Sequence, residues 1–152
     1  MTTPAAKGGA WVVYCDGASR GNPGRAAMGA VVIDPTGKVR HEVSESLGVT
    51  TNNVAEYRGL IAGLEAALAL GARRVEVRMD SELIVRQAIG RYRVRNPGLI
   101  PLHNRVLALR SRFDEVVFRH VPRGENKRAD ALANQALDRG QALRPGSGQA
   151  PS

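Results

Sequence analysis

The sequence lacks the features that would place the chain outside a reducing compartment or within a membrane. It contains one cysteine, Cys15, so no disulfide can form within the chain and a reducing environment is expected. No apolar run approaches the roughly 20 residues that a membrane-spanning helix requires. The segment from Met1 to Ala10 has no apolar core of the kind found in signal peptides. A length of 152 residues suits one domain that buries a core without disulfides or structural metals, so a soluble cytoplasmic protein is predicted.

Acidic residues are scarce in one part of the chain, and this locates the net charge. The chain carries 22 basic and 14 acidic side chains, for a net charge of +8. Residues 1–72 and residues 129–152 are each neutral by count, whereas residues 73–128 hold fourteen basic and six acidic side chains and carry the entire excess. Nearly all of it is arginine, whose planar guanidinium suits phosphate oxygens, so a polyanionic partner is predicted. The alternative is a merely solvated basic surface, which would spread the arginines more evenly along the chain.

The hydrophobic pattern predicts the element order β-β-β-α-β-α-α-β-α. Short apolar runs indicate strands, and apolar residues at helical spacing indicate helices. The expected strands are residues 11–15, 28–33, 38–47, 75–79 and 116–121, and the expected helices are residues 52–70, 81–89, 99–113 and 126–139. Residues 16–24 are expected to form a turn-rich connection.

This order predicts an α/β fold. Helices after the first three strands imply crossover connections, so the fourth and fifth strands should lie parallel to the first. The expected architecture is a mixed five-stranded sheet, an antiparallel meander plus two parallel strands, with helices on both faces. Residues 10–139 would form the domain, after a disordered leader at 1–9 and before a flexible tail at 140–152.

Four acidic residues stand where predicted elements begin or end: Asp16, Glu56, Asp80 and Asp130. Three of them have local explanations. Asp16 suits an Asp-Gly turn, Asp80 suits a helix N-cap, and Asp130 suits the positive end of a helix dipole. Glu56 is harder to explain locally, because its helix face holds small residues and its i+3 and i+4 neighbours offer no ion pair.

Together these residues predict a metal site. If the first strand is central and the fourth is its parallel neighbour, Asp16 and Asp80 emerge at the same edge of the sheet, where open α/β sheets bind ligands. Mg²⁺ prefers carboxylate oxygens and water as ligands. Two such ions about 3.5–4 Å apart can activate a water and stabilise the leaving oxygen of a phosphodiester. A carboxylate cluster in a strongly basic chain therefore predicts a nuclease.

At these residues the chain resembles the type 1 ribonuclease H family. The matching segments are residues 16–24 (DGASRGNPG), 50–56 (TTNNVAE), 79–81 (MDS) and 125–133 (ENKRADALA). Four motifs in the same order over roughly residues 11–138 form a specific signal. The resemblance implies a ribonuclease H-like fold and two bound Mg²⁺ ions, with Mn²⁺ as an alternative. Their ligands would be Asp16, Glu56, Asp80 and Asp130.

The resemblance also implies a substrate. It implies a monomeric endonuclease that hydrolyses the RNA strand of an RNA–DNA hybrid and leaves 3′-hydroxyl and 5′-phosphate ends. Residues that match groove-lining positions of the family are Asn22, Thr51, Asn52 and Asn53. In the family some of these positions touch 2′-hydroxyls, the groups that distinguish RNA from DNA.

One departure from the family pattern concerns the mobile histidine loop that many members carry. The segment 121–126 is too short for that loop. His120 falls within the fifth strand's pattern and is expected to be a structural strand residue. Arg123 is the candidate to take over part of the loop's role.

Two further departures concern the substrate side. The segment between the second and third helices is too short for the basic protruding helix of some bacterial members, and Glu82 stands where glutamine is common. Substrate contacts are expected instead from Arg91, Arg93 and Arg95. This compact form resembles a subgroup that also cleaves double-stranded RNA, so that substrate stays open.

Two other interpretations stay open from the sequence. A non-catalytic module would bind hybrids or double-stranded RNA without cleaving them, and it would be favoured if an acidic ligand were missing. A nuclease or strand-transfer enzyme of the same fold acting on DNA usually shows different spacing and extra domains.

Overall fold

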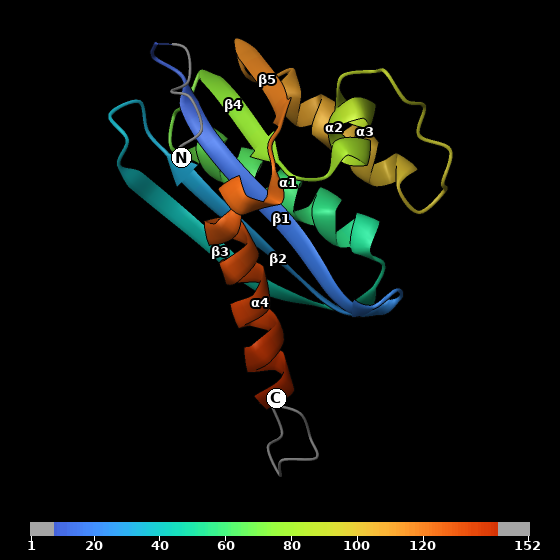
Figure 1. Ribbon diagram of the computed structural model, residues 1–152. Coiled ribbons are helices and arrows are strands. Elements are labelled where there is room, and N and C mark those ends of the chain that lie inside the picture. Colours follow the sequence, from blue (N-terminus) through green and yellow to red (C-terminus); the bar gives the residue numbers. More distant parts are fainter. Residues whose placement is uncertain (1–7, 143–152) are drawn as a thin grey trace.

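The computed structural model describes residues 8–142, and its elements follow the predicted order (Figure 1). The strands are β1 (Trp11–Gly21), β2 (Gly24–Ile33), β3 (Val39–Thr50), β4 (Arg74–Met79) and β5 (Glu115–His120). The helices are α1 (Asn52–Ala69), α2 (Glu82–Ala88), α3 (Ile100–Arg110) and α4 (Lys127–Ala142), with a 3₁₀ turn, η1 (Arg123–Glu125), before α4.

The strands form one mixed sheet in the order β3-β2-β1-β4-β5, which confirms the predicted topology. β1 pairs with β2, and β2 with β3, in antiparallel fashion. β1 pairs with β4, and β4 with β5, in parallel, as the crossover argument requires. β1 is therefore the central strand, and its neighbour β4 runs alongside it in the same direction.

The first strand is longer than predicted, and this changes the place of Asp16. Residues 16–24 do not form a turn-rich connection, because β1 and β2 stay paired as far as Gly21 and Gly24. That antiparallel pairing supplies the backbone hydrogen bonds that a sequence rich in glycine and asparagine would otherwise make locally. The pairing of β1 with β4 ends earlier, at Tyr14 opposite Arg78. Asp16 therefore lies within β1, just past the point where β4 has ended.

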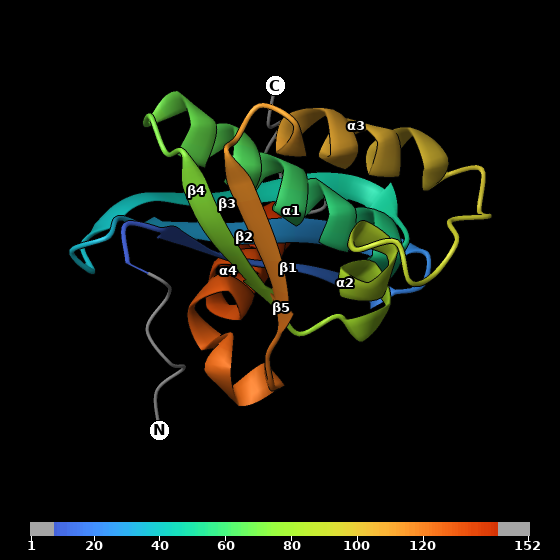
Figure 2. The same cartoon turned by 90° about the horizontal axis from the view of Figure 1, so that it is seen from above.

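Helices cover both faces of the sheet, as predicted (Figure 2). α1 packs on one face with α3 beside it, and α4 lies on the opposite face against β1, β2 and β3. The main core lies between α1 and the sheet and includes Val13, Leu60, Leu64 and Val77, all fully buried. This packing holds α1 and β1 together as one rigid base for the residues they carry.

The end of the domain was predicted too early. α4 continues to Ala142, so the first residues of the predicted tail at 140–152 belong to a helix. The remainder of that tail, residues 143–152, and residues 1–7 of the predicted leader lie outside the described residues. Among the helices of residues 8–142, none combines the length and the apolar character needed to cross a membrane.

Candidate active site

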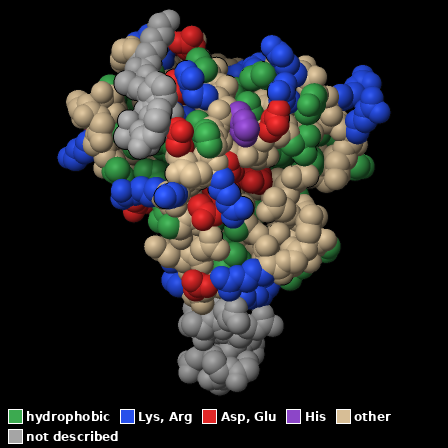
Figure 3. Space-filling view, viewed as in Figure 1, with side chains coloured by type: hydrophobic (Ala, Val, Ile, Leu, Met, Phe, Trp, Pro, Cys, Tyr) green, Lys and Arg blue, Asp and Glu red, His purple; other side chains and the backbone are tan. Residues whose placement is uncertain are grey.

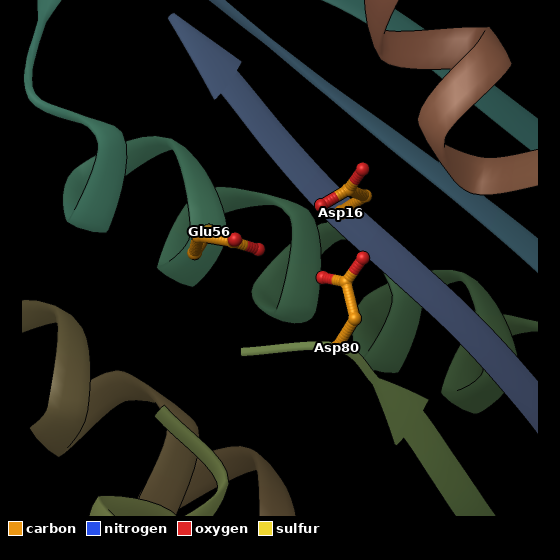
Figure 4. Close-up of side chains that lie close together, drawn as sticks. All are labelled: Asp16, Glu56 and Asp80. Carbon is orange, nitrogen blue, oxygen red and sulfur yellow. The ribbon is translucent and has the colours of Figure 1, made fainter. Parts of the chain in front are cut away.

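Three of the four predicted acidic residues converge at one point (Figure 4). Asp16 comes from β1, Glu56 from the first half of α1, and Asp80 from the residue after β4. Each offers a carboxylate oxygen, and these oxygens all lie within 4.8 Å of one another. Asp16 and Glu56 are buried, with 4% and 6% of their surfaces exposed. The local explanation of Asp80 as an N-cap is wrong, because Ser81 caps α2 by accepting from the Ile84 N–H at 3.3 Å.

Two glycines allow α1 to lie directly against β1 at this point. The Gly17 N–H donates to Asp16 Oδ1 at 3.0 Å and to Glu56 Oε1 at 3.1 Å. A Cβ at Gly17 would lie 2.3 Å from the backbone of Ala55 and Glu56, and one at Gly59 would lie 2.6 Å from the Asp16 carbonyl oxygen. Distances this short exclude any side chain unless the backbone moves. The small residues around Glu56 on α1 are therefore what brings its carboxylate to β1.

The carboxylates are held in an environment that disfavours their charged forms. Burial, and then the charges of Glu56 and Asp80, raise the pKa of Asp16 to about 9. Burial, and then the charge of Asp80, raise the pKa of Glu56 to about 8, although the hydrogen bond from Gly17 opposes the shift. Burial also raises the pKa of Asp80, against the opposing effect of the Arg123 charge. Clustered carboxylates that repel one another in a buried place are suited to bind a divalent cation, which would compensate their charge.

Asp130 and Arg123 lie at the rim of this cluster. Asp130, in the first turn of α4, is half-buried and raises the pKa of Asp16 further. Arg123 in η1 is exposed, and its guanidinium lies 3.9 Å from Asp130 Oδ1. Its positive charge also lowers the pKa of Glu56. The fourth carboxylate is thus brought to the site but stands outside the tight group of three, next to a cation.

The carboxylates line an open cleft of about 470 Å³. Of the predicted substrate residues, Asn52 and Arg123 line it. Lining residues that the sequence reasoning missed are Ser19, Arg20, Ser81, Asn134 and Leu137. Two patterns could have identified some of them. Arg20 follows Asp16 by four on the same face of a strand, and Asn134 and Leu137 follow Asp130 by four and seven on a helix.

Two other predicted substrate residues support the beginning of α1. The Thr51 side chain caps this helix by accepting from the Val54 N–H at 3.2 Å. Asn22, in the turn between β1 and β2, accepts from the Asn52 N–H through Oδ1 at 3.0 Å. Neither residue lines the cleft, nor does Asn53. Asn22 instead holds the backbone of Asn52, which does line the cleft, and Thr51 caps the helical turn that begins there.

Ion pairs occupy much of the basic segment 73–128. The pairs are Arg73–Asp114, Arg78–Glu76, Arg86–Glu82, Arg105–Glu65, Arg119–Glu76, Arg123–Asp130 and Arg128–Glu42. By contrast, Arg91, Arg93 and Arg95 are exposed in the loop between α2 and α3 and make no ion pair within residues 8–142. They do not line the cleft. Figure 3 shows acidic side chains near the middle of one face with basic side chains beside them.

His120 is the last residue of β5, paired with Met79, and it is exposed. Its expected place in the fifth strand is confirmed. The following segment 121–126 contains only the short turn η1 before α4 begins.

Cys15, beside Asp16, is fully buried, and burial together with the nearby carboxylates raises its pKa well above the ordinary value. A protonated thiol of this kind is a packing residue rather than a reactive one.

The chain is similar to known proteins over most of its length. The protein family described as "Reverse transcriptase-like" matches residues 14–136. The bifunctional protein Rv2228c of Mycobacterium tuberculosis is 49% identical over 128 residues, which cover 84% of this chain and 35% of that protein. Ribonuclease HI of Halobacterium salinarum is 46% identical over 132 residues, covering 87% of this chain and 66% of that protein. This chain therefore spans about a third of the mycobacterial protein's length.

Solved structures share the fold at similar identity. The N-terminal RNase H domain of Rv2228c superposes with a TM-score of 0.83, covering 84% of this chain and 98% of that one, at 49% identity. LC11-RNase H1, in complex with an RNA/DNA hybrid, superposes with a TM-score of 0.82, covering 86% of this chain and 99% of that one, at 45% identity. The structural similarity therefore extends over most of this chain and nearly all of each related domain.

Proposed function

Because this chain belongs to the type 1 ribonuclease H family, we propose that it is an endonuclease that hydrolyses the RNA strand of RNA–DNA hybrids. The observation that carries the proposal is the convergence of Asp16, Glu56 and Asp80, with their ligand oxygens within 4.8 Å, in an open cleft. A relative of 45% identity has been solved with an RNA/DNA hybrid bound. A module that only bound nucleic acid would have no need to bury mutually repelling carboxylates.

The donor set suits a hard divalent cation. Carboxylate oxygens are the ligands that Mg²⁺ prefers, and Mn²⁺ accepts the same ligands. We propose that two Mg²⁺ ions are held by Asp16, Glu56, Asp80 and Asp130. When bound, such a pair supplies an activated water and compensates the charge that develops on the leaving oxygen, which leaves 5′-phosphate and 3′-hydroxyl ends.

The protein's own part is to hold these carboxylates in place before substrate arrives. Gly17 and Gly59 bring α1 to β1, so the two buried carboxylates need no rearrangement on binding. Asp130 and Arg123 stand at the open rim, where the substrate backbone would enter. Arg123 is suited to hold a phosphate of the cleaved strand, since its guanidinium is exposed and faces the carboxylates.

The remaining predicted residues are proposed to bind the duplex. Asn52 lines the cleft, and Asn22, Thr51 and Asn53 lie at or beside the first turn of α1. The side-chain amide and hydroxyl groups of these residues can form hydrogen bonds with the 2′-hydroxyls and the phosphates of a duplex. The exposed arginines of the α2–α3 loop, Arg91, Arg93 and Arg95, would contact the backbone of the duplex farther from the cleft.

A cleavage assay on an end-labelled RNA–DNA hybrid with Mg²⁺ tests the proposal. Wild type should cut the RNA strand internally, and Asp16→Asn should not. Undiminished cleavage by Asp16→Asn would refute the site assignment, and equal cleavage of a DNA duplex would refute the substrate assignment. Tight hybrid binding by wild type with no cleavage would favour the binding module instead.

The same assay resolves the finer parts of the proposal. Ligation of the products to a 5′-hydroxyl or 5′-phosphate acceptor identifies which end carries the phosphate. Double-stranded RNA is proposed as a second, weaker substrate, and a duplex of the same sequence tests it directly. A cytoplasmic monomer is proposed as the working form. Light scattering of the purified chain would contradict the monomer if it gave twice the mass of 16.3 kDa.

A further inference from the structure

Asn126 is a buried polar side chain at the junction between η1 and α4. Only 1% of its surface is exposed. Its Nδ2 donates to the carbonyl oxygen of Cys15 in β1 at 3.0 Å. Its own carbonyl oxygen accepts from the Asp130 N–H at 3.1 Å. One residue therefore contacts β1 immediately before Asp16 and supports the helical turn that carries Asp130.

Other contacts hold α4 against β2 and β3. A Cβ at Gly29 in β2 would lie 2.2 Å from the Ala129 carbonyl oxygen, so the helix backbone touches the sheet there. The Ser44 hydroxyl in β3 donates to the Leu132 carbonyl oxygen at 2.6 Å. These contacts fix the helix against β2 and β3. Two links join this part of the chain to β1, the strand that carries Asp16. The ion pair between Arg20 and Asp138 lies farther along α4, and the Asn126 hydrogen bond lies directly beside Asp16.

The position of Asn126 carries a cost that a packing residue would avoid. Its Oδ1 is buried without a hydrogen-bond partner among residues 8–142. A buried acceptor left in that state destabilises a fold, whereas an apolar side chain of similar shape would not. An apolar side chain, however, could not donate to the Cys15 carbonyl. This hydrogen bond reaches β1 at Cys15, which follows the last residue of β1 that pairs with β4.

We propose that Asn126 is a positioning residue that sets the place of Asp130 relative to the three buried carboxylates. The inference rests on the proposed function, since it assumes that this site binds divalent metal. Asn126 would touch neither metal nor substrate. It acts through Asp130, by fixing the first turn of α4 against the backbone beside Asp16.

A double-mutant comparison tests this role. The variants are Asn126→Ala, Asp130→Asn and the two combined, with Ser44→Ala as the matched control, because Ser44 also makes a hydrogen bond between α4 and the sheet but from β3 rather than to β1. Mg²⁺ binding to the hybrid-free protein is measured by calorimetry, and the Mg²⁺ dependence of hybrid cleavage is measured alongside. Asn126→Ala should weaken Mg²⁺ binding by roughly 10–100-fold, the usual effect of losing an outer-shell partner. The same change should have no further effect in the Asp130→Asn background.

Ser44→Ala should lower the melting temperature but leave Mg²⁺ binding unchanged. Equal weakening by Asn126→Ala in both backgrounds, or equal weakening by Ser44→Ala, would overturn the inference. If Asn126→Ala does not fold, Asn126→Ser is compared in the same way. If wild type binds Mg²⁺ but does not cleave the hybrid, the proposed function fails, while the calorimetric comparison still decides the role of Asn126.

Discussion

Replacing Asp16 with asparagine should stabilise the metal-free protein while it abolishes hydrolysis. The Asp16 carboxylate lies within 4.8 Å of ligand oxygens of Glu56 and Asp80. Two unit charges at that distance, with an effective dielectric constant of about 20, repel by about 3.5 kcal/mol. Asparagine removes one of the charges and keeps an Oδ1 that can accept from the Gly17 N–H, as the carboxylate does at 3.0 Å. The expected gain in unfolding free energy is therefore about 3.5 kcal/mol where the carboxylates would otherwise be ionised.

The gain should depend on pH in a defined direction. The pKa of Asp16 is raised from an ordinary value of 3.8 to about 9 in the folded protein. A carboxyl group whose pKa is raised by folding contributes its full stability at a pH below its pKa in the unfolded chain. That contribution is lost as the pH rises through its pKa in the folded protein. The advantage of the variant should thus be near zero around pH 4 and should grow toward pH 8. The full gain of about 3.5 kcal/mol should be reached as the pH approaches the folded pKa of about 9, and it corresponds to a melting temperature about 7–14 °C higher for a chain of this size.

The assay is thermal unfolding in EDTA, followed by circular dichroism between about pH 4 and pH 9. Asp114→Asn is the matched control, because Asp114 is an exposed carboxylate paired with Arg73 outside the cluster. It should change stability by less than about 1 kcal/mol at any pH. Added Mg²⁺ should stabilise wild type and have little effect on Asp16→Asn. A variant no more stable than wild type at pH 8, or a gain that does not change with pH, would refute repulsion between Asp16 and the neighbouring carboxylates.

Three further outcomes are expected. Gly17→Ala should lower the free energy of unfolding in urea by about 1–3 kcal/mol, since its methyl would meet the α1 backbone at 2.3 Å. Gly124→Ala, where a Cβ meets nothing within 4 Å, should cost less than about 1 kcal/mol, and equal losses would contradict the close approach. Glu56→Gln should reduce hybrid cleavage in steady-state kinetics by more than the roughly 10–100-fold that the loss of an outer-shell partner costs, and retained activity would remove Glu56 from the metal site. Alanine at Arg91, Arg93 and Arg95 together should weaken metal-free hybrid binding and reduce the slope of log K against log salt by roughly 1–3, whereas an unchanged slope would place the loop away from the duplex.

The predicted topology rested on patterns that short segments carry by themselves. Short apolar runs and helical spacing identified every strand and α-helix of the described residues, and the crossovers after the third strand required parallel pairing of β4 with β1 and β5. The error at the end of the first strand has a clear cause. Residues 16–21 look like a turn because of their composition, but pairing with β2 makes them a strand. Local propensity is weak against such pairing, because tertiary contacts supply the hydrogen bonds.

The candidate site was likewise predictable in part from short motifs and in part not. The four acidic residues were identifiable because each lies in a short motif near the end of a predicted element. The motifs did not show that Asp130 stands outside the tight group, or that Thr51 and Asn22 support the start of α1. They also did not separate paired arginines from Arg91, Arg93 and Arg95, because an ion pair depends on which surfaces meet.

The sequence by itself determined the order of elements, the class of fold and the chemical type of the site, because these depend on residues close together along the chain. Only the tertiary structure decided how the site is assembled. The Gly17–Glu56 hydrogen bond joins residues 39 apart, and the Asn126–Cys15 hydrogen bond joins residues 111 apart. Contacts over such separations form only when helices pack on a sheet, and here packing depends on the absence of a side chain at Gly17, Gly29 and Gly59.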